Sequence, residues 1–224
     1  KGRLYGQVNP VFTGNVLGVQ NGEDITATYS TTATTNSPVG TYSIVPTLND
    51  PGSKLSNYTV VTNNGTLAID PASLTGTAEN KSRLYGQVNP VFTVTYSGFV
   101  NGENSGIVTG TLTGSTTANT NSPVGNYPIT VSGQSAPNYA ITYVDGVLTV
   151  NPAALLVQAE DKSRAYGQSN PVLTASISGF VNSEDTNVLG GALVISTTAD
   201  TNSPVGTYPI VASGLTSTNY SITY

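Results

Sequence analysis

The most regular feature of the chain is an alternation of apolar and small polar residues with a period of two. It occurs in residues 72–86 and again in residues 91–100, where Phe92 and Tyr96 stand on the same side of the pattern. A period of two predicts β-strands with one buried face. Asn89-Pro90 lies between the two stretches and predicts a turn, because the residue before proline is pushed out of the helical region.

Residues 126–150 contain further strand patterns. Ile129 and Val131 alternate with polar residues, and Ser122-Pro123-Val124-Gly125 before them has the residue order of a type I turn. Asp145-Gly146 separates two short apolar runs, which predicts a β-hairpin.

One segment predicts a short helical turn instead of a strand. Asn101 could cap it, Glu103 would lie in its first turn and Gly110 would end it. Residues 180–191 repeat this pattern. About five strands and one helical turn in some 80 residues predict a mainly β, β-grasp-like module, with an immunoglobulin-like β-sandwich as the alternative. The β-grasp arrangement is favoured because the turn falls where that fold places its helix, and because the Cys and Trp residues typical of immunoglobulin domains are absent.

The whole pattern occurs three times. Tyr5, Tyr85 and Tyr166 lie 80 and 81 residues apart, each in a Tyr-Gly-Gln context. A fixed period indicates tandem modules. The predicted modules are residues 1–70, 71–151 and 152–224.

The two terminal modules are each one strand short. The first has no counterpart of residues 72–80, and the third has no counterpart of residues 144–150. The first also carries extra residues in a late loop, residues 47–57. A missing strand leaves backbone groups unpaired, so we expect the terminal modules to be less stable than the middle one and prone to accept a strand from another chain.

Composition narrows the possible chemistry. Charged residues make up 8% of the chain, the net charge is −5, and there is no Cys, His, Trp or Met. The absence of clustered Lys and Arg argues against nucleic-acid binding. Disulfides, thiolate or imidazole metal ligands and Cys or His nucleophiles are excluded. We therefore expect no enzyme, and assign no catalytic, cofactor-binding or metal-binding residues.

A string of four motifs carries a family resemblance. In the middle module these are Tyr-Gly-x-x-Asn-Pro, Gly-Phe-Val-Asn-Gly-Glu, Ser-Pro-Val-Gly-x-Tyr and Asn-Tyr-x-Ile-x-Tyr-x-x-Gly-x-Leu-x-Val. The string resembles the MBG domain, YGX type, of bacterial surface adhesins. The first module departs from it at residues 14–24, where Val19 and Gln20 replace Phe-Val, which suggests different packing there. The resemblance implies a place in the repetitive region of an exported bacterial protein and no catalytic residues.

Three sets of recurring side chains have a functional and a structural interpretation. Glu23, Glu103 and Glu184 could bind calcium, but a solvated helix start is favoured, because no further acidic residues complete a ligand set. The 13 tyrosines could stack on sugars, but positions such as Tyr127, Tyr139 and Tyr143 favour the core.

The recurring cations are the third set. Lys81 and Arg83 recur in register in all three modules, as do the residues around them. Such a lysine could form an isopeptide crosslink with a neighbouring Asn. Exposed salt bridges are favoured, since these stretches are polar.

The sequence therefore predicts a non-catalytic stalk of a bacterial surface adhesin that projects a distal binding domain. The alternative is an adhesive module that binds polysaccharide or self-associates between cells. We expect an extracellular, elongated monomer whose partners are neighbouring repeats, without nucleic-acid or membrane contact and without a cofactor. The start within a motif and the absence of Met indicate a piece excised from a longer chain.

Overall fold

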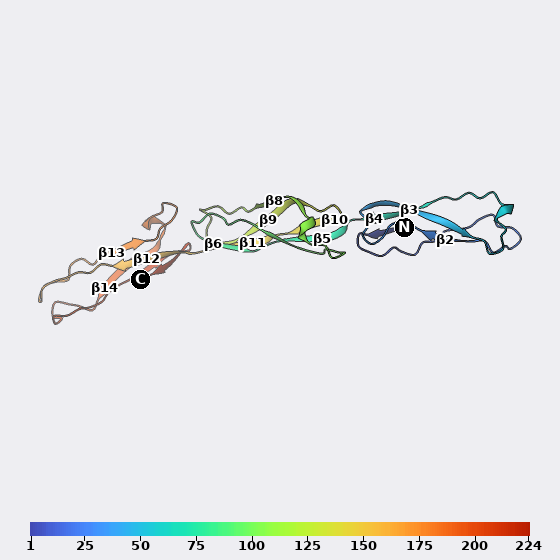
Figure 1. Ribbon diagram of the computed structural model, residues 1–224. Helices are drawn as coiled ribbons and strands as arrows, with labels where there is room; N and C mark the ends of the chain where they lie inside the picture. Colours follow the sequence, from blue (N-terminus) through green and yellow to red (C-terminus); the bar gives the residue numbers. More distant parts are fainter. The chain divides into compact units, whose positions relative to one another are not determined.

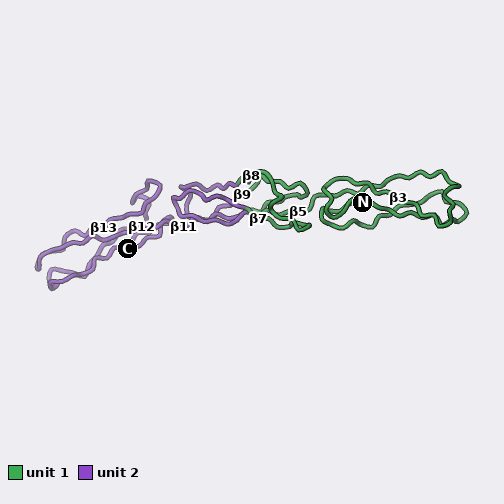
Figure 2. Tube along the Cα trace, viewed as in Figure 1, with its two compact units in different colours: residues 1–77, 94–113, 131–144 green, residues 78–93, 114–130, 145–224 purple.

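The computed structural model describes all residues from 1 to 224. The protein is mainly β-structure, and its only helices are three single 3₁₀ turns (Figure 1). Its contacts divide it into two compact units (Figure 2). Unit 1 comprises residues 1–77, 94–113 and 131–144, and unit 2 comprises residues 78–93, 114–130 and 145–224. The division passes through the middle repeat, so each unit contains one complete boundary between repeats.

Unit 1 contains two sheets. In the first, β1 runs parallel to β4, and β3 lies between β4 and β2 in antiparallel pairing. In the second, β5 lies between β10, to which it is parallel, and β7. The strands are β1 (Gly2–Leu4), β2 (Thr26–Ser30), β3 (Gly40–Asn49), β4 (Gly65–Asp70), β5 (Ala72–Ala78), β7 (Val94–Ser97) and β10 (Tyr139–Val144).

Unit 2 contains the equivalent pairings one repeat further along. A four-stranded sheet has the order β6-β11-β9-β8, a three-stranded sheet the order β13-β12-β16, and β14 pairs with β15. Strands β8 and β9 continue across the division between the units. The strands are β6 (Lys81–Leu84), β8 (Thr109–Ser115), β9 (Gly125–Ser135), β11 (Gly146–Asn151), β12 (Ala153–Ala159), β13 (Ala175–Ser178), β14 (Gly190–Thr197), β15 (Ile210–Thr216) and β16 (Tyr220–Thr223).

The predicted alternation of buried and exposed side chains is confirmed in the strands. Ile129 and Val131 of β9 are buried, with exposed neighbours on both sides, and Leu74 occupies a buried position of β5. Tyr139 of β10 is buried as well. The strand predicted from residue 91 begins only at Val94, since residues 91–93 form an irregular approach to it.

The prediction of the helical turn was wrong in its details. The 3₁₀ turn η2 (Ser105–Ile107) is capped by Asn104, whose side chain accepts a hydrogen bond from the Gly106 N–H. Asn101 instead has a left-handed backbone, with φ of 55°, in the tight turn before it. The third repeat has the same arrangement in η3 (Thr186–Val188), whereas the turn of the first repeat, η1 (Leu55–Asn57), lies in its late insertion.

The hairpin predicted at Asp145-Gly146 does not form. Strand β10 pairs with β5, whereas β11 pairs with β6 and β9, so these consecutive strands belong to different sheets. Gly146 lets the chain pass from one sheet to the other close to the end of β5, because a Cβ at this position would lie 2.7 Å from the Ala78 carbonyl oxygen. The Val147 N–H then donates to Asn80 Oδ1 at 2.8 Å, a bond that fixes the start of β11.

Each terminal repeat lacks one strand, and the segments that would pair with that strand are irregular as well. In the first repeat, residues 14–17 and 58–63 are the counterparts of β7 and β10, and neither forms a strand, because β5 pairs those two in the middle repeat. In the third repeat, residues 162–165 correspond to β6 and are irregular, because the counterpart of β11 is absent. A groove of about 560 Å³ lies beside residues 14–17 and 58–63 of the first repeat. A groove of about 580 Å³ lies beside residues 162–164 of the third repeat.

These grooves lead to a prediction about local stability. Hydrogen exchange should be faster in residues 1–70 and 153–224 than in residues 72–150, because each terminal repeat has open strand edges that the middle repeat lacks. Exchange followed by mass spectrometry of peptides from the three repeats measures this difference. Equal protection in corresponding strands of all three repeats would contradict it.

Candidate functional site at the joint between consecutive repeats

The first and middle repeats are joined through one carboxylate and two tyrosines. Tyr5, from the first repeat, donates its hydroxyl proton to Glu103 Oε1 at 2.8 Å. Tyr139, from the middle repeat, donates to Oε2 of the same carboxylate. The two buried rings meet edge to face, with centroids 5.6 Å apart and an interplanar angle of 78°. Charge-assisted hydrogen bonds in a buried setting are strong, so this trio fixes the two repeats together. We call this contact the first joint.

The second joint, between the middle and third repeats, has the same construction. Tyr85 donates to Glu184 Oε1 at 2.6 Å, and Tyr220 donates to Glu184 Oε2 at 2.5 Å. The rings of Tyr85 and Tyr220 lie 5.7 Å apart at 84°. Because each joint lies within one compact unit, the same trio is built independently in both.

The glycine that follows Tyr5 and the one that follows Tyr85 are required by close packing. Gly6 and Gly86 have φ of +83° and +81°, a conformation that favours glycine. A Cβ on Gly6 would lie 2.5 Å from Val100 Cγ2, and one on Gly86 would lie 2.4 Å from Val181 Cγ2. A valine of the following repeat therefore packs directly on the backbone of each Tyr-Gly pair.

Two further hydrogen bonds cross each joint at its rim. In the first joint, the Val39 N–H donates to Asn138 Oδ1 at 3.1 Å and Asn101 Nδ2 donates to the Thr35 carbonyl at 3.2 Å. The second joint repeats both bonds at the same lengths, from the Val124 N–H to Asn219 Oδ1 and from Asn182 Nδ2 to the Thr120 carbonyl.

The apolar centre of each joint is formed by the chain segment that connects the repeats. In the first joint, Ile69 of β4 and Leu74 of β5 pack in one cluster with Tyr5 and Tyr139. In the second, Val150 and Leu155 pack in the same way with Tyr85 and Tyr220. The connecting strand, interrupted by a single proline, therefore belongs to the core on both sides of the boundary.

An arginine holds the loop that presents each Tyr-Gly pair, and we call this loop the Tyr-Gly arch (residues 3–9, 83–89 and 164–170). Arg83 Nε donates to Asn89 Oδ1 at 2.8 Å, and Asn89 Nδ2 donates to the Ala118 carbonyl at 2.7 Å. Arg83 is only 5% exposed and Arg3 only 6%. The prediction of exposed salt bridges was therefore wrong for these arginines, which bind neutral acceptors instead.

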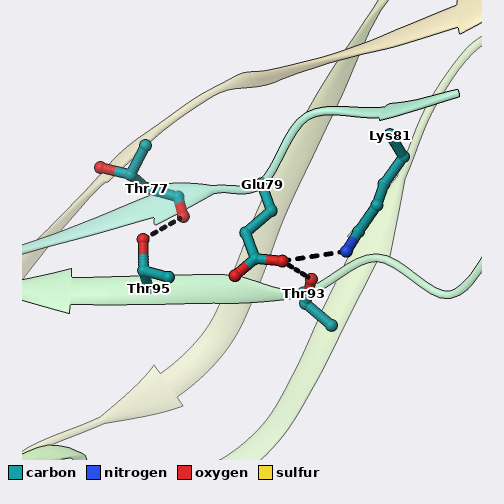
Figure 3. A network of polar contacts seen from close by, with 5 residues as sticks. All are labelled: Thr77, Glu79, Lys81, Thr93 and Thr95. Atoms are coloured by element: carbon teal, nitrogen blue, oxygen red, sulfur yellow. Dashed lines mark hydrogen bonds and ion pairs between the residues drawn. The ribbon is translucent and has the colours of Figure 1, made fainter.

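Two of the three recurring lysines, Lys81 and Lys162, form ion pairs, the first of them partly buried, whereas Lys1 forms none. Lys81 Nζ lies 2.9 Å from Glu79 Oε2, and the same oxygen accepts the Thr93 hydroxyl at 2.6 Å (Figure 3). These two partners, Thr93 first, lower the pKa of Glu79 below its usual value. Lys162 and Glu160 repeat the pair at 2.9 Å in the third repeat. Figure 3 also shows the Thr95 hydroxyl donating to the Thr77 carbonyl.

The role of the recurring glutamates was missed from the sequence. Glu103 and Glu184 lie neither at a solvated helix start nor in a group of three or more acidic side chains, but between two tyrosine hydroxyls. Glu23 has one such partner in this chain, Tyr58, whose hydroxyl donates at 2.5 Å. The available signal was the constant register between these glutamates and the tyrosines of two neighbouring motifs.

The environment of the tyrosines predicts a loss of stability in alkali. Burial, and then the hydrogen bond to Glu103, raises the pKa of Tyr139 from 10.0 to about 12, and burial and Glu184 do the same for Tyr220. Because the folded pKa lies above the unfolded one, their contribution to stability is complete below pH 10 and is lost as the pH rises through about 12.

Thermal unfolding midpoints measured between pH 9 and 12 test this expectation, taking the ordinary tyrosine pKa of about 10 as reference. The Tyr220→Phe variant should show a shallower fall, because it has one raised pKa fewer. An identical pH profile in the variant would contradict the assignment.

These features define a tandem β-repeat protein in which each repeat docks on the next through a Tyr-Gly arch. The chain belongs to the MBG domain (YGX type) family, which it matches over residues 1–68, 74–149 and 155–224. The resemblance found in the sequence is thereby confirmed, and repeats of this family are typical of bacterial surface proteins. No curated protein and no solved structure matched the chain. None of its helices has the length and apolar character needed to cross a membrane.

Proposed function

We propose that this chain is a non-catalytic stalk of a bacterial cell-surface adhesin, in which the repeats project a distal binding domain outside the cell. The observation that carries the proposal is the repetition of one joint, with the same trio of side chains at Glu103 and at Glu184. An array built by repeating one contact gains length with each module without needing any new interaction.

The joint has the properties that a spacer needs. Only Pro71 separates β4 from β5, and only Pro152 separates β11 from β12, so the connections have little freedom to swivel. The carboxylate and the valine of the next repeat then hold the arch from two sides. A stalk with such joints keeps a distal domain at a defined distance, whereas flexible linkers would let it collapse toward the surface.

Spin-label distance measurements test whether the joint is rigid. The chain has no cysteine, so Thr41→Cys and Thr111→Cys, at exposed positions of the first and middle repeats, give one defined pair of labels. We expect a single narrow distance distribution that broadens when Tyr5→Phe is added. Asp24→Asn, an exposed change away from the trio, should leave it narrow. A broad distribution in the chain that carries only the labels would reject the stalk.

The alternative function is an adhesive module that binds polysaccharide. Saturable binding of the 224-residue chain to immobilised polysaccharide would support this function over a pure spacer.

A further inference from the structure

We propose that the peptide bond between Asp70 and Pro71, which connects the first repeat to the middle one, is a self-cleavage site that reacts in acid. The Asp70 carboxyl is the nucleophile, and the Tyr5 N–H stabilises the charge that develops on the carbonyl under attack. The cleavage is a single event within the chain and consumes only water. The proposal rests on the first joint and does not require that the array be a stalk.

The joint fixes the backbone on both sides of this bond. The Tyr5 N–H donates to the Asp70 carbonyl at 2.8 Å, and the Ala72 N–H, just after the proline, donates to the Asn138 carbonyl at 3.0 Å. An N–H that bonds a carbonyl oxygen binds it more strongly once attack gives that oxygen a negative charge. The arch of the first repeat therefore also supplies a donor for the transition state of cleavage.

The nucleophile is free to reach this carbonyl. Asp70 is exposed, and neither a hydrogen bond nor an ion pair holds its carboxylate. Because the carboxyl and the carbonyl belong to the same residue, rotation about the Cα–Cβ bond between staggered positions is the only movement needed. Pro71 is exposed as well, so water has access to the bond.

The reaction is a hydrolysis in two steps. A side-chain oxygen of Asp70 bonds to the Asp70 carbonyl carbon, the carboxyl proton passes to the Pro71 nitrogen, and the C–N bond breaks. Asp70 is left as a cyclic anhydride, and Pro71 as the secondary amine that a tertiary amide releases. Water then opens the anhydride and gives a free carboxyl end at Asp70. Acid is required because the carboxyl must carry the proton that the nitrogen takes.

The second joint has the same backbone contact but no nucleophile. Asn151 occupies the position of Asp70, and its carbonyl accepts the Tyr85 N–H at the same 2.8 Å. The Ala153 N–H donates to the Asn219 carbonyl at 3.0 Å, as Ala72 does to Asn138 in the first joint. Since an amide side chain carries no carboxyl proton, the bond before Pro152 should stay intact in acid.

The other Asp-Pro bond of the chain, at Asp50-Pro51, has a carboxyl that is not free to move. Asp50 Oδ2 accepts the Leu55 N–H at 2.7 Å, and Oδ1 is buried. Backbone hydrogen bonds, from Lys54 first and then from Leu55, also lower the pKa of this carboxyl, so it takes up a proton only in stronger acid. The folded chain therefore favours cleavage at Asp70 over cleavage at Asp50.

Cleavage at Asp70 cuts the chain at a repeat boundary without at once separating the pieces. The trio at Glu103 still joins residues 1–70 to residues 71–224. The two fragments therefore part only when the first joint opens, and the second joint stays covalently intact.

Incubation of the 224-residue chain at about pH 2–3, where carboxyl groups are protonated, tests the proposal. We expect mass spectrometry to identify fragments 1–70 and 71–224, with cleavage at Asp70 at least about tenfold faster than at Asp50. In concentrated urea, which removes both the joint and the loop around Asp50, the two bonds should be cleaved at similar rates. Equal rates in the absence of urea would overturn the proposal.

Two variants exchange the residues of the two joints. Asp70→Asn should abolish cleavage at this bond and should fold, since asparagine occupies the same position in the second joint. Asn151→Asp should create a new cleavage before Pro152, at a rate similar to that of the Asp70 bond. Cleavage that continues in Asp70→Asn, or a second joint that stays intact in Asn151→Asp, would contradict the assigned chemistry.

Discussion

Replacing Gly86 by alanine is expected to destabilise the second joint by about 2–5 kcal/mol. The left-handed backbone at φ +81° adds about 1–2 kcal/mol for a residue with a Cβ. The new methyl group would also lie 2.4 Å from Val181 Cγ2, and overpacking of this kind costs about 1–3 kcal/mol. The change should appear as faster local hydrogen exchange in β12, the strand that forms the far side of the joint.

Gly167 supplies the matched control within the same chain. It occupies the same position in the motif and has φ of +82°, but its Cβ would meet no atom within 4 Å. Gly167→Ala should therefore show only the backbone contribution of about 1–2 kcal/mol. If the two alanine variants were equally stable, the packing of Val181 on the arch would have no energetic importance.

Removing the shared carboxylate of the second joint is the other change with a large expected effect. Glu184→Ala leaves the hydroxyls of Tyr85 and Tyr220 without their acceptor, although both tyrosines are buried. A buried donor without a partner costs about 1–3 kcal/mol, so we expect a loss of about 2–4 kcal/mol in the local stability of the joint. Hydrogen exchange in β12 and β16 measures this loss.

The same substitution in the first repeat is the comparison. Glu23→Ala removes a carboxylate with one tyrosine partner, Tyr58, which is only partly buried, so its effect should be less than half as large. A double-mutant cycle of Glu184→Ala with Tyr85→Phe then isolates the bond that crosses the joint. A coupling energy near zero would mean that this bond does not hold the repeats together.

The strands and the repeats could be predicted because they depend on local patterns. The alternation at Ile129 and Val131 predicts a strand with one buried face, and this holds for any partner strand. The period of the motifs can be read directly from the sequence. The two local errors have a common cause. Asp145-Gly146 has the residues of a hairpin turn, but pairing is decided by β5, β6 and β9, which lie elsewhere in the sequence. Asn101 resembles a helix cap, but its amide is used by the preceding repeat.

The joint could not be predicted, because it forms between residues far apart in the sequence. Tyr5 and Glu103 are 98 positions apart, and neither stands in a motif that suggests the other. Arg83 resembles an exposed cation, since its neighbours are polar and its neutral acceptors are one side-chain amide and carbonyls that any residue can offer. Only the constant spacing of the tyrosine, the glycine and the glutamate in the repeats indicates the contact. Because the repeats share these residues, comparing them does not show which of the residues touch one another.

The two joints are built from equivalent residues at corresponding positions. Recombination can therefore change the number of repeats without changing the contact between them. If residues 81–161 were deleted, Asn80 would be followed by Lys162, and the chain would continue in the same motif. Tyr5 would then face Glu184 and Tyr220, and Gly6 would face Val181, which are the counterparts of its present partners. Unequal exchange between repeats of the gene would thus add or remove whole modules and leave a working contact at every junction. A lineage could change the number of repeats in one step, without passing through a chain length that fails to fold.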